Sequence, residues 1–298
     1  MFRRFYFRKP VILFYGAKGW IGTLFLNYIK LNHNNLTFIE GNARIENETD
    51  VKAEIKLHRP TNVVSFTGRT HGKIGDQLIN TIDYLEYPGK LVENIRDNLN
   101  GPVVLANLCK KFGIHYTYLG TGCIFNSDTL NPFDEKSKPN YFGSGYSIVK
   151  GFTDTIMQSY QHVLNLRIRM PISSVVNNRN FITKITNYSK ICSIPNSMTV
   201  LDDFFPIFID LILKKKAGTY NCTNPGTISH DEILTKYKNI IDNDFKWENM
   251  TLEDQNKILK SERSNNCLNT DTIQMEYPKL KGIKDSVDIV LNRMKLTS

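Results

Sequence analysis

The chain has 298 residues, 41% of them hydrophobic and 22% charged, which allows a full core and excludes a disordered tail or a disulfide-stapled miniprotein. No window approaches the roughly 20 uninterrupted apolar residues of a membrane-spanning helix. The net charge of +9 comes from scattered Lys and Arg, with short clusters only at Arg3–Arg4 and Lys214–Lys216, which favours a basic surface or an anionic substrate over a nucleic-acid site.

The N-terminus and the cysteines indicate the cellular compartment. Residues 1–16 resemble a signal peptide only faintly, because their apolar run breaks at Gly16 and a glycine-rich helix start follows instead of a cleavage site. We expect a short basic extension that leads into a strand. No CxxC pair occurs, so a disulfide framework or a zinc site is disfavoured and a reducing, cytoplasmic location is expected. The five cysteines are Cys109, Cys123, Cys192, Cys222 and Cys267.

Strand-like and helix-like segments alternate through the first half of the chain, a pattern typical of βαβ units and a parallel sheet. The predicted strands are 11–15, 36–40, 62–66, 116–119 and 163–170. The predicted helices are 20–31, 50–58, 91–112 with an interruption at Gly101–Pro102, and 147–162. Residues 67–84 are polar and too long for a simple connection, so they are expected to form a functional loop.

The pattern becomes irregular after Pro171, with a predicted helix at 203–216, a strand at 219–222 and a helix at 230–241. We therefore predict an α/β fold with a Rossmann-like, doubly wound parallel sheet. Residues 1–170 would form an NAD(P)-binding domain, and residues 171–298 mainly a smaller substrate-binding α/β region. Segments near 203–222 are expected to pack back on the first domain.

Residues 16–22 read GAKGWIG, a GxxGxxG motif between an apolar strand and an amphipathic helix. Glycines allow a tight turn and close approach of the backbone, and a helix N-terminus offers free N–H groups to a pyrophosphate. Glu40 is suited to a ribose diol and favours NADH, whereas Arg44 is suited to a 2′-phosphate and favours NADPH. These residues leave the choice open; NADPH is the expected coenzyme and NADH the alternative. The predicted coenzyme-binding residues of the motif are Gly16, Lys18, Gly19, Trp20, Ile21 and Gly22.

Tyr146 and Lys150 form a YxxxK motif at the start of a predicted helix, where this spacing puts both side chains on one face. A nearby ammonium favours the phenolate, so Tyr146 is expected to exchange protons nearer neutral pH and, with Lys150, to contact the coenzyme. Thr121 and Cys123 follow the fourth predicted strand, at the edge where open α/β sheets bind ligands. Thr121 would donate a hydrogen bond to a substrate carbonyl. Cys123 is either a packing residue or an acid/base whose thiolate a cation stabilises.

Sequence blocks along nearly the whole chain carry a resemblance to a known family. The blocks are GAKGWIG (16–22), FTGR (66–69), GTGCIF (120–125), YSIVK (146–150), RIRMPISS (167–174), RNFITKI (179–185), IPNSMTVLDD (194–203), NCTNPGTISHDEI (221–233) and RSNN (263–266). With them the chain resembles the bifunctional 3,5-epimerase/4-reductases of UDP-rhamnose synthesis. These enzymes are similar to dTDP-4-dehydrorhamnose reductases, in the extended short-chain dehydrogenase/reductase superfamily.

The resemblance implies conversion of UDP-4-keto-6-deoxy-D-glucose to UDP-L-rhamnose, by 3,5-epimerisation and then NAD(P)H-dependent reduction of the 4-ketone. It implies a reductase triad of Thr121, Tyr146 and Lys150, and an epimerase acid/base pair of Cys123 and Lys184. It also implies a homodimer formed through the predicted helices 91–112 and 147–162. The candidate substrate-binding residues are Arg69, Thr121, Asn180, Asn224 and Arg263, with His71 as a weaker candidate.

Two regions depart from the family pattern, and two alternative functions stay open. Residues 70–90 differ and the segment between Asn126 and Tyr146 is shorter, so substrate contacts there are not predicted. One alternative is a dTDP-4-dehydrorhamnose reductase without epimerase activity, against which Cys123 argues. The other is a non-catalytic regulatory subunit on the same fold, against which the joint presence of Thr121, Tyr146 and Lys150 argues. No membrane partner is expected, and a nucleic-acid-binding role lacks a basic stripe or an aromatic platform.

Overall fold

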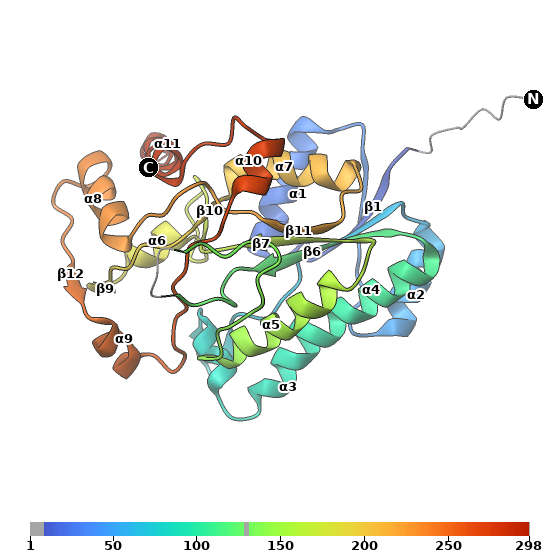
Figure 1. The fold of residues 1–298 in the computed structure, drawn as a ribbon, viewed down its shortest axis with the longest axis horizontal. Helices are drawn as coiled ribbons and strands as arrows, with labels where there is room; N and C mark the ends of the chain where they lie inside the picture. The colour runs from blue at the N-terminus through green and yellow to red at the C-terminus, as the bar shows by residue number, and fades with distance from the viewer. Residues whose placement is uncertain (1–8, 128–130, 298) are drawn as a thin grey trace, which may run out of the picture.

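A six-stranded, all-parallel sheet in the order β11-β7-β6-β3-β1-β2 forms the centre of the molecule (Figure 1). The structure, a computed structural model, describes residues 9–127 and 131–297, so the predicted basic extension at residues 1–8 lies outside the described residues. The order and the parallel pairing confirm the predicted doubly wound α/β fold. The strands are β1 (Val11–Tyr15), β2 (Thr37–Glu40), β3 (Asn62–Ser65), β6 (His115–Thr121), β7 (Val163–Ile168) and β11 (Gly218–Asn221).

Helices cover both faces of the sheet, with α1, α7 and α10 on one side and α2, α4 and α5 on the other (Figure 1). Side chains alternate along β1, so Ile12 and Phe14 join the core under α1 and α7, whereas Leu13 and Tyr15 join the core on the other face. These helices are α1 (Trp20–Asn32), α2 (Glu48–His58), α4 (Gly101–Phe112), α5 (Gly145–Gln158), α7 (Leu201–Leu213) and α10 (Asp271–Glu276).

The second half of the chain divides between the sheet and a separate apolar cluster. β11 pairs with β7 in parallel, and Phe204 and Phe208 of α7 are buried in the same core as Phe14. The separate cluster contains Ile172, Met198 and further buried residues of this half. The elements of this half that lie outside the central sheet and its covering helices are β8 (Pro171–Ile172), α6 (Phe181–Ile185), β9 (Lys190–Cys192), β10 (Thr199–Val200), α8 (His230–Ile240), β12 (Glu248–Met250), α9 (Leu252–Ile258) and α11 (Ile283–Thr297). No helix in the described ranges is long and apolar enough to cross a membrane.

The predicted helix 91–112 continues through its glycine–proline pair with a change of hydrogen bonding. It consists of α3 (Lys90–Ile95), a π-helical turn η2 (Arg96–Asn100) and α4. Pro102 has no N–H with which to bond the Asn98 carbonyl four residues back, and the Thr153 hydroxyl of α5 donates to that carbonyl at 2.7 Å instead. The side chain of Asn98 also binds the backbone N–H and carbonyl of Arg69, both at 2.8 Å. The π-helical turn thus anchors the segment that leaves β3.

The predicted loop 67–84 contains regular structure of its own. A two-stranded antiparallel hairpin, β4 (Gly72–Ile74) and β5 (Gln77–Ile79), is followed by a 3₁₀-helix η1 (Ile82–Glu86). The strands have three residues each, too few for the alternation of apolar and polar residues to identify them. Residues that flank the hairpin, among them His71 and Asn80, line the cleft described next.

Candidate active site

A cleft of about 830 Å³ opens at the carboxyl ends of β1, β3 and β6 and reaches into the second half of the chain. The chain leaves β1 for β2 on one side and returns to β3 on the other, so the cleft lies at the topological switch point, where open α/β sheets bind ligands. It brings together residues that are more than a hundred positions apart. The predicted site residues that line it are Gly19, Trp20, Ile21, Gly22, His71, Thr121, Cys123, Tyr146, Lys150, Lys184 and Arg263.

The glycine-rich turn between β1 and α1 is closed so tightly that side chains cannot enter it. Gly16 has a φ of +94°, and a Cβ on Gly22 would lie 2.0 Å from the carbonyl oxygen of Gly16. Gly19 caps α1 without a side-chain hydrogen bond, and no acidic residue occupies the first turn. The first N–H groups of α1 are therefore available to an anion. The indole Nε1 of Trp20, buried beside them, has no partner among the described residues. These features fit the pyrophosphate of a dinucleotide.

Substitution of Gly22 by alanine should weaken coenzyme binding by about tenfold or more, or at least 1.4 kcal/mol. The added Cβ would meet the Gly16 carbonyl oxygen at 2.0 Å, so the turn must open and misplace its N–H groups. Titration of NADPH fluorescence measures the dissociation constant. Gly282→Ala is the matched control, since its Cβ would meet only the Pro225 carbonyl, at 3.6 Å. An unchanged dissociation constant for Gly22→Ala would remove the turn from the coenzyme site.

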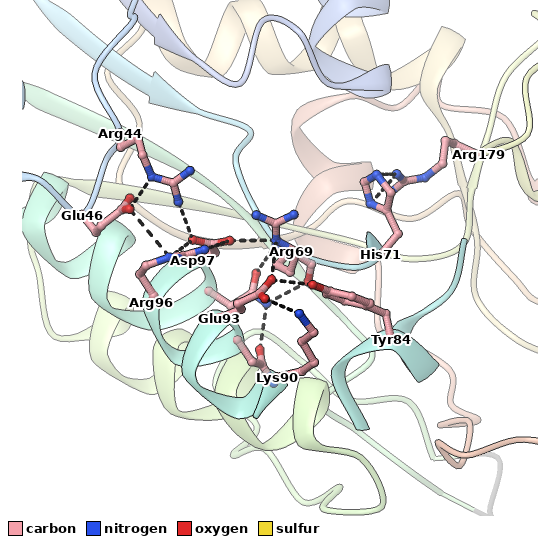
Figure 2. A network of polar contacts seen from close by, with 12 residues as sticks. Arg44, Glu46, Arg69, His71, Tyr84, Lys90, Glu93, Arg96, Asp97 and Arg179 are labelled. Atoms are coloured by element: carbon pink, nitrogen blue, oxygen red, sulfur yellow. Dashed lines mark hydrogen bonds and ion pairs between the residues drawn. The ribbon is translucent and has the colours of Figure 1, made fainter. Parts of the chain in front are cut away.

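The residues expected to select the coenzyme lie at the exit of β2, outside the lining of the cleft. Glu40 ends the strand and is exposed. Arg44 is also exposed, and its guanidinium is held by Glu46 at 2.5 Å and Asp97 at 3.1 Å (Figure 2). Lys18 of the glycine-rich turn points to solvent.

Tyr146 and Lys150 project from the first turns of α5, which begins at a Ser144 cap. Both are buried, and the Tyr146 phenol shares a hydrogen bond with the Thr121 hydroxyl. The Lys150 Nζ instead donates to the Tyr118 hydroxyl and to the Leu119 carbonyl, the latter at 3.3 Å. Burial lowers the pKa of Lys150 to about 7.

The expectation that Lys150 brings the pKa of Tyr146 toward neutrality is wrong for this structure. Burial raises the pKa of Tyr146 above its ordinary value, and the neighbouring Cys123 raises it further. The Thr121 hydrogen bond lowers this pKa by less. The physical reason is that the phenol packs in an apolar cluster with Tyr84, where a phenolate is poorly solvated. Tyr146 is therefore a proton donor at neutral pH.

Cys123 faces the same cleft from the segment after β6. Its backbone N–H donates to the Thr121 hydroxyl at 3.1 Å, and its carbonyl accepts from the Ser147 hydroxyl of α5 at 2.7 Å. These bonds fix the thiol-bearing segment to the helix that carries Tyr146. The thiol is half-buried and free, and its Sγ lies 3.9 Å from the Arg169 guanidinium.

Lys184 enters the cleft from the second half of the chain, on the short helix α6. Its Nζ donates to the Asn80 carbonyl at 3.3 Å, at the end of the hairpin. Burial, followed by the charges of Arg179 and Arg263, lowers the pKa of Lys184 to about 8. At neutral pH it is mostly an ammonium that gives up its proton more readily than a surface lysine.

The candidate substrate-binding residues separate into two groups. Arg263 lines the cleft, with its guanidinium bound to the Asp83 carboxylate and to the Ser261 carbonyl at 2.7 Å. Arg69 lies outside the lining and binds Asp97 at 2.8 Å in a network of ion pairs (Figure 2).

Asn180 and Asn224 do not line the cleft, and both are fully buried. The Asn180 amide caps α6 and donates to the Ser173 carbonyl at 2.7 Å. The Asn224 side chain binds the Asp203 carboxylate and the Val200 N–H, each at 2.8 Å. Because the fold occupies both amides, we correct their assignment from substrate binding to structural support.

Two arginines of the cleft carried no predicted role. Arg179 donates to the Thr70 hydroxyl at 2.7 Å and lies 2.7 Å from the Nδ1 of His71 (Figure 2). Burial and the charge of Arg179 lower the pKa of His71 to about 4, so the imidazole is neutral. Arg169 is buried beneath Cys123. Both arginines lie in sequence blocks that carry the family resemblance, but neither matches a spacing motif that would mark it alone.

Comparisons with known proteins agree with this geometry. The family model for the NAD dependent epimerase/dehydratase family matches residues 12–176. The crystal structure of the L780 UDP-rhamnose synthase from Acanthamoeba polyphaga mimivirus matches this structure with a TM-score of 0.92. The match has 48% sequence identity and covers 96% of this chain and 100% of that chain. A bifunctional dTDP-4-dehydrorhamnose 3,5-epimerase/dTDP-4-dehydrorhamnose reductase from Arabidopsis thaliana is 39% identical over 92% of this chain and 90% of its own length.

A more distant solved structure shares the fold alone. It is the dTDP-4-dehydrorhamnose reductase from Bacillus anthracis, solved in complex with NADP, with 18% identity and a TM-score of 0.77 over 98% of this chain and 100% of that chain. Together the matches confirm the resemblance drawn from the sequence blocks.

Proposed function

Because this chain belongs to the NAD dependent epimerase/dehydratase family, we propose that it is a bifunctional nucleotide-sugar enzyme. It converts UDP-4-keto-6-deoxy-D-glucose to UDP-L-rhamnose, first by epimerisation at C3 and C5 and then by reduction of the 4-ketone. One observation carries this assignment: a hydroxyl, a thiol and a phenol, those of Thr121, Cys123 and Tyr146, line one cleft beside a dinucleotide-binding turn. A nearly full-length relative whose name gives both activities supports it.

The coenzyme and the substrate would be held by different parts of the chain. The turn at residues 16–22 is suited to the dinucleotide, and a nicotinamide coenzyme bound there supplies the hydride for C4. Lys184 and Arg263 enter the cleft from beyond residue 170, which supports the division into a coenzyme-binding part (1–170) and a mainly substrate-binding part (171–298). We propose NADPH as the preferred coenzyme, supported by the exposed Arg44 guanidinium after β2.

In the epimerisation, the protons at C3 and C5 are acidic because each carbon flanks the ketone. Removal of either proton breaks a C–H bond, and the electron pair moves through the new C=C bond to O4 as an enolate. Tyr146 and Thr121 would donate hydrogen bonds to that oxygen, as the donors of an oxyanion hole do. Cys123 and Lys184 then divide the proton transfers, one removing a proton and the other returning one to the opposite face.

In the reduction, the same oxygen accumulates negative charge as C4 accepts the hydride. Tyr146, whose pKa is raised by burial, is protonated at neutral pH and can transfer its proton to O4. Thr121 holds that oxygen in both reactions. One pair of donors thus stabilises both transition states.

The decisive test offers UDP- and dTDP-linked 4-keto-6-deoxyglucose to the purified chain in heavy water, with NADPH or NADH. We expect coenzyme oxidation, deuterium at C3 and C5, and a product whose ring stereochemistry by NMR is that of L-rhamnose. Oxidation without deuterium incorporation would identify a reductase alone. Coenzyme binding without oxidation for any sugar would identify a regulatory subunit.

We propose a homodimer that forms through α3 and α5, which lie side by side on one face of the molecule (Figure 1). Leu91 and Val92 of α3 and Phe152 of α5 are 55%, 69% and 59% exposed, which is high for large apolar side chains. Val92→Glu should therefore shift the sedimenting mass from twice 34.3 kDa to a single chain. Leu31→Glu on α1 is the control, and a wild-type monomer would contradict the proposal.

The state of the cysteines supports the proposed cytoplasmic location. All five cysteines are free thiols in the structure. Free thiols persist in reducing compartments, where disulfides rarely form.

A further inference from the structure

Tyr118 of β6 contacts the Lys150 side chain from outside the lining of the cleft. Lys150 lines the cleft, whereas Tyr118 is 1% exposed and does not line it. The Lys150 Nζ donates a hydrogen bond to the Tyr118 hydroxyl and lies 4.4 Å from the centre of the Tyr118 ring. One tyrosine therefore offers a single ammonium both a hydrogen-bond acceptor and an aromatic face.

The alternation of side chains along β6 explains this contact. Tyr118 belongs to the core on the face of the sheet that α2, α4 and α5 cover, whereas its neighbour Leu119 belongs to the core on the opposite face. Lys150 projects from α5, the helix that packs on the Tyr118 side. The strand that ends at Thr121 thus also carries the side chain that meets Lys150.

Lys150 is a buried ammonium without a carboxylate partner. No ion pair within residues 9–127 and 131–297 includes it, and Asp154, one turn further along α5, binds the Arg167 guanidinium instead, at 2.7 Å. The second acceptor of the ammonium is the Leu119 carbonyl, at 3.3 Å. An ammonium has three N–H groups, so β6 binds two of them and leaves the third for a ligand in the cleft.

A buried cation that has only neutral acceptors depends strongly on each of them, because the protein interior solvates charge poorly. We propose that Tyr118 is a positioning residue that holds Lys150 as an ammonium and fixes its third N–H for the bound coenzyme. The contact between Lys150 and the coenzyme rests on the proposed function; the pairing of Tyr118 with Lys150 does not.

The other titratable groups that act on Lys150 lie on α5 and in the segment after β6. Burial lowers the pKa of Lys150 to about 7, and Asp154 and Cys123 raise it by less. Burial raises the pKa of both Tyr118 and Tyr146, so these phenols are neutral near pH 7. Asp154, Cys123 and Tyr146 all remain when the Tyr118 hydroxyl is removed. Its loss should therefore lower the pKa of Lys150 further, because the ammonium loses an acceptor.

The test compares NADPH dissociation constants of the wild type and Tyr118→Phe across a pH series, measured by fluorescence without any sugar. Phenylalanine keeps the ring and removes only the hydroxyl. At about pH 8 the variant has less ammonium, and it should bind NADPH about tenfold more weakly than the wild type, as expected for one hydrogen bond to a charged group. Near pH 5.5 both proteins have a protonated Lys150, so the difference should shrink to about threefold or less.

Tyr116→Phe is the matched control. Tyr116 lies two residues earlier on β6, in the same core, and is also fully buried, but the Lys150 Nζ donates to Tyr118 and not to it. This variant should bind NADPH as the wild type does at both pH values. In a Lys150→Met background, Tyr118→Phe should have no further effect, because the two side chains act as a pair.

Two results would overturn the proposal: a Tyr118→Phe variant that binds NADPH as tightly as the wild type at pH 8, or one that is weaker by the same factor at both pH values. Failure of the proposed function would be distinct, because Lys150 can be titrated without coenzyme or sugar. Acetic anhydride labels the full-length protein across the pH series, and mass spectrometry follows the Lys150 peptide. Even in a protein that binds no NADPH, the Lys150 inflection should lie about half a unit or more lower in Tyr118→Phe, and equal inflections would exclude the pairing.

Discussion

The Tyr146→Phe variant should lose reduction of the 4-ketone by about 10²–10⁴-fold, the usual contribution of a positioned acid. In the proposed mechanism its phenol donates a proton to the ketone oxygen, and burial together with Cys123 raises its pKa and keeps it protonated near neutral pH. Phenylalanine keeps the packing of the ring in its apolar cluster and removes only the hydroxyl. Coenzyme oxidation in a single turnover, followed by stopped-flow absorbance, measures the effect.

The control variant removes the hydroxyl of a tyrosine that does not line the cleft. Tyr160 lies just beyond α5, and its hydroxyl donates to the Asn107 side chain at 2.7 Å at the surface. Tyr160→Phe should reduce the ketone at the wild-type rate. The glycine-rich turn is untouched in both variants, so each should still bind the coenzyme. A Tyr146→Phe variant that oxidises the coenzyme within about twofold of the wild-type rate would exclude the phenol as the acid.

Replacement of Cys123 by alanine should suppress deuterium incorporation at C3 and C5 by about 10²-fold or more. The Cys123 thiol lines the cleft, with its Sγ 3.9 Å from the Arg169 guanidinium, and in the proposed mechanism it exchanges a proton with a ring carbon. Tyr146 and the coenzyme turn remain in this variant. A keto-sugar that is already epimerised should therefore still be reduced, which separates the two activities. The exchange is measured by NMR or mass spectrometry of sugar recovered from heavy water.

Cys267→Ala is the matched control. This thiol is also partly buried but does not line the cleft, and its Sγ accepts from the Ser197 hydroxyl and donates to the Leu268 carbonyl, each at 3.9 Å. Its exchange rate should equal that of the wild type. If Cys123→Ala also exchanged both carbons at the wild-type rate, the thiol would have no part in epimerisation.

The core strands and the glycine-rich turn were predictable because each depends on residues close together in the sequence. The apolar run 11–15 is β1, and the glycines of GxxGxxG, between a strand and a helix, mark a turn that only glycine permits at Gly22. The YxxxK spacing likewise depends only on helix geometry, and both of its side chains reach the cleft. The structure that such a local pattern predicts does not depend on residues far away in the sequence.

Roles that depend on distant partners were not predictable. An asparagine that caps a helix and one that binds a ligand look alike in a sequence, so Asn180 could be distinguished only by its bond to Ser173. Arg69 was predicted to bind the substrate. The structure instead binds its guanidinium to Asp97, which is 28 residues away in the sequence. The pKa of Tyr146 was mispredicted for a related reason, since the spacing to Lys150 says nothing about how deeply the phenol is buried.

The edge strand β11 comes from the second half of the chain, and this affects both folding during synthesis and the stability of shorter fragments. A ribosome that has released only residues 1–170 has delivered five of the six strands, with β7 as an unprotected edge and no α7 over the core that contains Phe14. Such an edge is a template for aggregation. Native assembly must therefore wait until synthesis passes residue 221, and a recombinant fragment that stops at 170 should accumulate in inclusion bodies.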